Sequence, residues 1–133
     1  MRSLSLVGLC VLVCGGSAQA AAECLSDQGV RESISGRLSV VRTHDEAGQV
    51  ERPYILTLQK PVCLSTLDAD SIEAATTIQV YATDDELLQR LKQSVGKSLQ
   101  LRGRFFAADT AYHHAPIVME VIEIPPGPKP RRW

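Results

Sequence analysis

The chain has 133 residues, and its 14 Lys and Arg residues nearly balance its 15 Asp and Glu residues, which gives a net charge of −1 at pH 7. This length suits one small domain with a single hydrophobic core. The near-neutral charge argues against a dedicated nucleic-acid-binding protein, because such proteins carry an excess of basic residues that neutralise phosphates.

The first 20 residues have the pattern of a secretory signal peptide. Arg2 supplies a positive charge, an apolar run extends from Leu4 to Val13, and Ala18-Gln19-Ala20 offers a cleavage site of small residues. The apolar run is too short to span a bilayer as a mature helix. We therefore expect cleavage near Ala20–Ala22, export to the periplasm or beyond it, and no membrane span.

The cysteines predict one disulfide in the exported chain. Cys10 and Cys14 lie within the leader, so cleavage leaves Cys24 and Cys63. Two cysteines in an oxidising compartment are typical of a disulfide. A redox or metal-binding pair is the alternative, but the chain has no C-x-x-C spacing that would favour it.

Alternating apolar and polar residues predict a β-hairpin in the first half of the chain. The alternation is found in Ile34–Val40 and again in Tyr54–Gln59, and the turn-forming cluster Asp45–Gly48 lies between them. A turn centred near Ala47 brings Cys63 to the far end of the hairpin. A second turn at 27–29 then brings Cys24 back to it.

A third strand is predicted over Thr77–Ala82, where apolar and polar residues again alternate. The preceding segment, Leu64–Thr76, is polar and acidic. We expect it to be a connection that contains one short helical turn.

After Ala82 the apolar residues no longer recur at every second position but at the spacing of a helix. Thr83–Glu86 fits a capping box, in which Thr83 begins the helix and acidic residues occupy the first turn. Gly96 is a typical helix stop. One apolar stripe at helical spacing is expected to pack in the core, and it consists of Leu87, Leu88, Leu91 and Val95.

Two further strands are predicted after the helix. Leu99–Phe105 alternates, 107–116 is expected to be a loop, and Ile117–Ile124 is mostly apolar, which favours a central or bulged strand. Residues 125–133 are proline-rich and basic, and we expect them to form a flexible tail.

The order of elements predicts a mainly β fold. Three strands, a helix and two strands match a small, five-stranded, OB-like barrel with one α-helix between strands 3 and 4. The barrel would occupy residues 21–124, with the leucine stripe of the helix plugging one end. An α+β sandwich is the alternative.

The pattern G-x-F-F-x-A-x-T-x-x-H-H-x-P extends from Gly103 to Pro116. The segment around it, 96–119, resembles a bacterial family called domain of unknown function 4431. The segments Tyr54–Leu58 and Pro61–Leu64 also resemble this family, so the resemblance extends roughly from Ile34 to Glu123. Because the family has no assigned activity, the resemblance bears on fold and compartment rather than on chemistry.

The chain departs from the family pattern at three positions in its most specific part. Ala111, Tyr112 and Ala115 stand where the family has Gly, His and Thr. These changes leave fewer polar side chains in this stretch than the family pattern has.

The histidines are candidate metal ligands. His44 lies in the loop between the first two predicted strands, and His113 and His114 lie in the loop between the last two. These loops flank the usual ligand face of an OB barrel, so the three imidazoles, with Asp45 and Asp109 nearby, form a candidate zinc or copper set. Against this, adjacent residues in an extended chain point to opposite faces. In the alternative, His113 and His114 hydrogen-bond the loop backbone and pack beside Tyr112.

Other side chains give weaker indications. Neighbouring strands place three arginines on one outer face, which either binds an acidic partner or is a solvated face that discourages edge pairing: Arg37, Arg102 and Arg104. Tyr54 alternates in step with leucines that are predicted to face the core. Tyr81 and Tyr112 do not, and they are candidates for stacking against a ligand. Trp133, with Arg131 and Arg132, is either mobile or a small docking motif.

We predict an exported binding module without catalytic residues and without a cofactor. Its partner is an unknown protein, such as an enzyme that it inhibits, or a component of the cell envelope. The predicted binding rim comprises His44, Asp109, Thr110, Tyr112, His113 and His114. A periplasmic protein that binds zinc or copper through the histidines is the second hypothesis. A hydrolytic enzyme that uses Asp109, Thr110 and the histidines is the third, although the chain has no G-x-S-x-G motif.

Overall fold

The computed structural model describes residues 24–67, 70–110 and 113–127. The predicted signal peptide, Tyr112 and residues 128–133 of the predicted tail lie outside these ranges. Within the described residues, no helix is long and apolar enough to cross a membrane.

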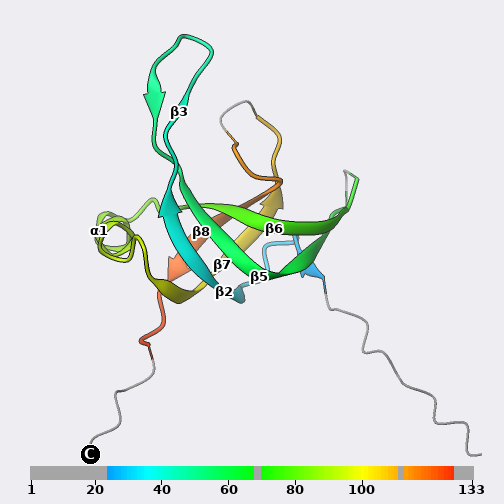
Figure 1. The fold of residues 1–133 in the computed structure, drawn as a ribbon. Coiled ribbons are helices and arrows are strands. Elements are labelled where there is room, and N and C mark those ends of the chain that lie inside the picture. Colours follow the sequence, from blue (N-terminus) through cyan, green and yellow to red (C-terminus); the bar gives the residue numbers. More distant parts are fainter. Residues whose placement is uncertain (1–23, 68–69, 111–112, 128–133) are drawn as a thin grey trace, which may run out of the picture.

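Five long strands form a closed barrel (Figure 1). In sequence order they are β2 (Glu32–Val40), β5 (Tyr54–Ser65), β6 (Ile72–Tyr81), β7 (Ser98–Ala107) and β8 (Ile117–Glu123). Their order around the barrel is β5-β2-β7-β8-β6, and the pairing of β5 with β6 closes it. All five contacts are antiparallel except the parallel pair of β6 with β8. The predicted mainly β, five-stranded barrel is therefore confirmed, and the alternative sandwich is wrong.

Three additional strands of two residues each were not predicted. They are β1 (Leu25–Ser26), β3 (Thr43–His44) and β4 (Val50–Glu51). The helix α1 (Asp85–Gln93) consequently lies between β6 and β7 rather than between the third and fourth strands. Two residues are too few to show an alternating pattern, which is why the sequence did not indicate these strands.

The predicted loop at 64–76 is also wrong. β5 continues to Ser65 and β6 begins at Ile72, and Leu64 pairs directly with Ile72. Among the polar residues of this stretch, Ser65, Glu73 and Thr76 occupy exposed strand positions. The described residues between the strands, 66–67 and 70–71, are not helical.

The predicted hairpin between the first two long strands is confirmed in its register. Val40 pairs with Tyr54 and Thr43 with Glu51, so the hairpin is centred on Ala47. At the turn, the side chain of Asp45 accepts a hydrogen bond of 2.8 Å from the amide of Gln49.

The predicted disulfide is confirmed. Cys24 and Cys63 are bonded, with their Cα atoms 4.6 Å apart. Beyond Cys24, β1 lies parallel to β5 with Leu25 opposite Leu64, and Gly29 turns the chain back with a φ of 78°. This left-handed conformation suits glycine because a Cβ atom disfavours it. The bridge thereby fixes the start of the described chain to the barrel.

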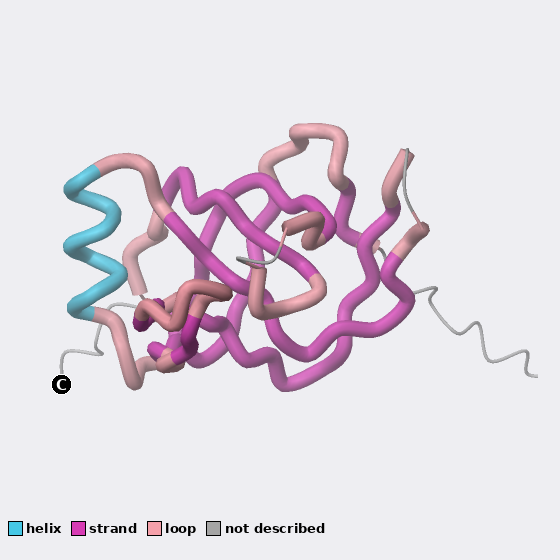
Figure 2. Tube along the Cα trace, turned by 90° about the horizontal axis from the view of Figure 1, so that it is seen from above, coloured by secondary structure: helices cyan, strands magenta, loops and turns pink. Residues whose placement is uncertain are grey.

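The helix α1 covers one end of the barrel (Figure 2). Its N-cap is Asp84 rather than the predicted Thr83, and the carboxylate of Asp84 accepts a 3.0 Å hydrogen bond from the amide of Leu87. At the other end Gly96 has a φ of 84° and stops the helix as predicted. The Arg90 side chain donates a hydrogen bond to the carbonyl of Ile124, which ties the helix to the end of β8.

The predicted leucine stripe packs only in part. Leu91 is fully buried, and Leu87 and Leu88 are half-buried. Val95 is 39% exposed and does not belong to the core. It follows the C-cap residue Ser94, so it is no longer on the helical face that the spacing assumed.

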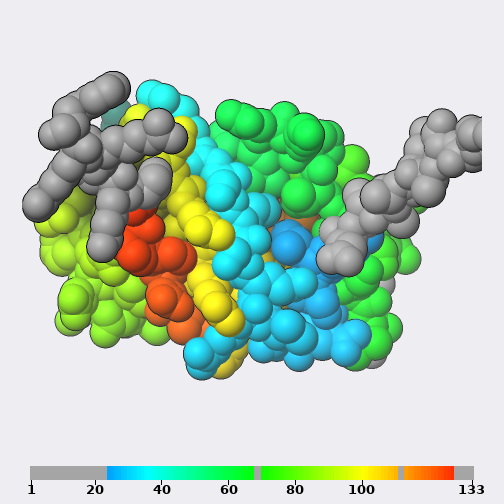
Figure 3. Space-filling view, turned by 90° about the horizontal axis from the view of Figure 1, so that it is seen from below, coloured from blue at the N-terminus to red at the C-terminus, as the bar shows by residue number. Residues whose placement is uncertain are grey.

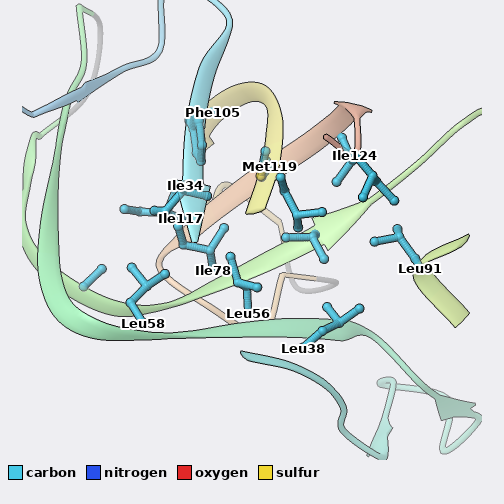
Figure 4. Close-up of a cluster of buried hydrophobic side chains, with 14 of the residues drawn as sticks. Ile34, Leu38, Leu56, Leu58, Ile78, Leu91, Phe105, Ile117, Met119 and Ile124 are labelled. Atoms are coloured by element: carbon cyan, nitrogen blue, oxygen red, sulfur yellow. The ribbon is translucent and has the colours of Figure 1, made fainter. Parts of the chain in front are cut away.

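The core fills the barrel with aliphatic side chains and Phe105 (Figure 4). β8 contributes most densely, because it is paired on both sides and its residues Ile117, Val118 and Met119 are all fully buried. This confirms the central position predicted for the last apolar strand.

Two glycines permit close approaches between strands. A Cβ on Gly103 would overlap the carbonyl oxygen of Glu120 on β8, at a shift in the β7–β8 register. A Cβ on Gly36 would lie 2.6 Å from the carbonyl oxygen of Thr57. Both positions lie within paired strands, so relief of either clash requires the backbone to move.

Gly103→Ala should therefore lower the free energy of unfolding by about 2–3 kcal/mol, because a forced methyl group displaces β8 from the barrel. Urea denaturation of the variant and of the parent protein measures this difference. Gly127→Ala is the matched control, since nothing lies within 4 Å of the added Cβ there. Equal stability of the two variants would contradict the close approach.

Replacing both cysteines, in the variant Cys24→Ala/Cys63→Ala, should lower the free energy of unfolding by about 4 kcal/mol. The expected loss arises because the bridge joins residues 39 apart in sequence and so restricts the unfolded chain. Denaturation of the oxidised protein, the reduced protein and the variant tests this. Two alkylatable thiols in the protein recovered from its native compartment would rule out the bridge.

Candidate functional site

Two connections project from the same side of the barrel, at the top of Figure 1. One is the segment 41–53, which contains the β3–β4 hairpin, and the other is the loop 108–116 between β7 and β8. We call these two segments the rim. Of the predicted rim residues, Tyr112 lies outside the described residues.

His114 joins the two halves of the rim. Its Nε2 atom lies 2.9 Å from a carboxylate oxygen of Glu51 and 3.3 Å from the hydroxyl of Thr43. Its backbone N–H donates a 2.6 Å hydrogen bond to the side-chain oxygen of Gln79 on β6. One residue therefore fastens the loop 108–116 both to the β3–β4 hairpin and to the barrel wall.

His113 has a different set of partners. Its Nδ1 atom accepts hydrogen bonds from the amides of Asp109, at 3.1 Å, and Thr110, at 3.4 Å. These two contacts hold the ring of His113 against the backbone of its own loop. The Asp109 carboxylate lies 3.4 Å from the same Nδ1 atom, and the His113 amide donates to the carbonyl of Thr110. The imidazole thus organises its own loop, as in the alternative derived from the sequence.

Aromatic rings support this loop from below. Phe106 contacts His113 edge-on, with ring centroids 5.9 Å apart, and contacts Tyr81 in the same manner at 6.2 Å. Burial, together with the nearby negative charge of Glu120, raises the pKa of Tyr81. Tyr81 is thus half-buried beneath the rim, whereas Tyr54 packs against the core as its phase predicted.

His44 does not join the other two histidines. Thr43 and Glu51 form a registered pair and contact His114, whereas His44 and Val50 form the next pair. Successive residues of a strand point to opposite faces, so the exposed His44 ring is directed away from the face that contacts His114. Within the part of the chain that the structure describes, no group of three or more His, Cys, Asp and Glu side chains is placed to hold a metal ion.

Val50, which pairs with His44, is exposed, and two more exposed valines stand where β2 leads into the hairpin. Val40, Val41 and Val50 are 39%, 40% and 45% exposed, and they make up half of the large apolar side chains that are exposed among the described residues. The hairpin therefore has one face that is bonded to His114 and one on which His44 and Val50 are exposed to solvent.

The three predicted arginines share an outer face but do not form one cluster. Arg37 is opposite Ser98 and Arg102 is opposite Ser33, which separates the two arginines by about four residues, or about 13 Å, along the strands. Arg102 and Arg104 are each also registered with a glutamate of β8. Their charge is thereby balanced across the sheet, whereas Arg37 has no such neighbour in the register.

Four residues of the site were missed in the sequence: Thr43, Glu51, Gln79 and Phe106. Gln79 and Phe106 lie on strands at positions that face outward, where a polar or aromatic residue gives no distinctive signal. Thr43 and Glu51 belong to the two-residue strands. The only sequence signal that pairs them is their equal distance from Ala47, the centre of the turn.

His114→Ala and Glu51→Ala should each lower the free energy of unfolding by about 1 kcal/mol, because the contact between them is partly exposed to solvent. The double variant should be scarcely less stable than either single one, because the two side chains share one interaction. Urea denaturation of all four proteins measures the coupling. His44→Ala, on the opposite face, should change stability by less than about 0.5 kcal/mol. If the stability loss of the double variant equals the sum of the two single losses, the contact between His114 and Glu51 contributes nothing to stability.

Comparison with known proteins gives one match. Residues 77–125 match the family described as Domain of unknown function (DUF4431). This range contains the second half of β6, all of α1, β7 and β8, and the loop that carries His113 and His114. The segments within 54–64 that also resemble the family lie outside the matched range. Neither the curated proteins nor the solved structures contain a match. The resemblance seen in the sequence is thus confirmed, and over residues 77–125 the chain matches the DUF4431 family.

Proposed function

We propose that the chain is an exported binding module that holds a partner protein at the rim of an OB-like barrel. The observation that carries the proposal is the set of contacts made by His114, which join two loops far apart in sequence into one surface. A surface that is ordered before binding loses less conformational entropy when a partner docks.

The strand pairing supports the OB-like assignment. Counting only long strands, the first pairs with the second and fourth, and the third pairs in parallel with the fifth. The helix follows the third of these strands. In OB folds, the loops between strands 1 and 2 and between strands 4 and 5 flank the ligand face, and these are the two segments of the rim.

Export is supported by the leader pattern and by the disulfide. Bridges such as Cys24–Cys63 form and persist in oxidising compartments and are rare in the cytosol. The proposed site of action is therefore the periplasm or the extracellular space.

The chemistry of the rim favours a protein partner. Val41 and Val50 in the segment 41–53 supply exposed apolar contact area, and the rim also carries exposed polar side chains at His44, Asp109 and Thr110. Protein interfaces combine apolar contact area with polar groups at the periphery.

The test is affinity capture by the tagged mature protein from its native periplasm, with the bound proteins quantified by mass spectrometry. We expect one partner in stoichiometric amount, and about tenfold less of it with Val41→Ser/Val50→Ser, because truncating central apolar contacts removes most of the binding energy. The matched control is Val30→Ser/Val95→Ser, which removes two exposed valines outside the rim. Equal capture by both variants would refute a role for the rim.

The same samples test the metal hypothesis. His114 and Glu51 already form a histidine–carboxylate pair, and these are ligand types that zinc accepts. Near-stoichiometric zinc or copper in the purified protein, lost in His113→Ala/His114→Ala, would replace partner binding as the proposed function.

A further inference from the structure

The barrel has a gap in its pairing between β2 and β5. Their register ends at Arg37 opposite Thr57. Beyond this point β2 stays paired with β7 as far as Glu32, and β5 rejoins β6 only at Val62, after a shift in register. Residues 58–61 of β5 therefore bulge away from both neighbours.

A groove of about 790 Å³ occupies this gap. Its volume lies within the range of sites that bind ligands. Figure 3 shows the recess between the cyan atoms of β2 and the green atoms of β5. Apolar side chains from three strands line it, namely Ile34, Leu58, Val62 and Leu99.

One wall of the groove is an unpaired strand edge. Leu38 directs its backbone groups toward the β7 side, where they bond to Gly96 and Lys97. In an antiparallel strand the direction alternates, so Ser33 and Ser35 direct their backbone groups toward β5. No described residue is registered with them on that side. The edge is thus available to another extended chain.

The groove is also positively charged. Arg37 and Lys60 line it and are exposed, and the other lining residues include no Asp or Glu. Neither cation forms an ion pair with any residue that the structure describes. The unbalanced charge favours an anionic occupant.

We propose that this groove binds an extended, acidic peptide segment of a partner protein, which adds to the free edge of β2. Apolar side chains of the peptide would contact Ile34 and Leu58, and its carboxylates would pair with Arg37 and Lys60. Such strand addition draws affinity from main-chain hydrogen bonds and specificity from side-chain pockets. The chain's own C-terminus is an unsuitable occupant, because it carries Lys129, Arg131 and Arg132.

The probe is a synthetic peptide of about six residues that alternates Glu and Val, a length that covers the unpaired edge. Titrated into the mature, oxidised protein, it should shift the NMR signals of residues 33–37 and 57–62 and slow amide exchange at Ser33 and Ser35. Arg37→Ser/Lys60→Gln should raise its Kd about tenfold, whereas Arg31→Ser/Lys92→Gln, which removes two exposed cations outside the groove, should leave it unchanged.

Two further peptides define what would overturn the proposal. A Lys and Val peptide should bind at least about tenfold more weakly, and a copy methylated on alternate backbone nitrogens should not bind, because it cannot donate to the edge. Equal binding of either peptide, or no binding of the acidic peptide at about 1 mM, overturns strand addition at this groove. Because the groove lies away from the rim, Val41→Ser/Val50→Ser should leave this affinity unchanged, so failure here is distinguishable from failure at the rim.

Discussion

The parallel pairing of β6 with β8 is the contact on which the rest of the molecule depends. It joins the strand before the helix to the last strand of the fold and is one of the five pairings that close the barrel. With β7 on its other side, β8 loses all access to solvent along Ile117–Met119, and the core forms around it. The pairing also sets Gln79 beside Val118, which places the Gln79 side chain beneath the loop 108–116.

The rim follows from that closure. Gln79 can accept the His114 amide only because β6 and β8 are adjacent, and the His114 ring then faces the β3–β4 hairpin. Phe106 and Tyr81 fill the space below, from strands on either side of β8. The loop is therefore positioned by buried strands and not by its own sequence alone, as is usual for binding loops on a rigid scaffold.

Periodicity and turn chemistry made much of the fold predictable. The hairpin register about Ala47 followed from alternation on both sides of a turn-forming cluster, and the helix followed from its acidic first turn and Gly96. The N-cap was misplaced by one residue because Thr83 and Asp84 are both good capping residues, and the choice depends on the entry angle of the chain. The ends of β5 and β6 were missed because exposed strand positions tolerate the polar residues that suggested a loop.

The site was less predictable, because it depends on which face each residue of a short strand presents. The sequence placed His44, His113 and His114 in the two segments that do form the rim. It gave no means to see that Thr43 rather than His44 faces His114, since β3 has only two residues. The groove was missed for a related reason. Pro61 cannot donate a backbone hydrogen bond and marks the unpaired stretch of β5, but an isolated proline within an alternating segment indicates only an irregular strand.

The close approach at Gly36 separates the two surfaces proposed for binding. Above it β2 and β5 remain paired as far as Val40 and lead into the hairpin, and below it they part around the groove. With room for no more than a hydrogen between Gly36 and the Thr57 carbonyl, the strands are pinned at the point where pairing ends. An added strand can therefore occupy the groove without opening the ladder that carries the rim. The close approach at Gly36 would thus let β2 contribute to both proposed binding surfaces independently.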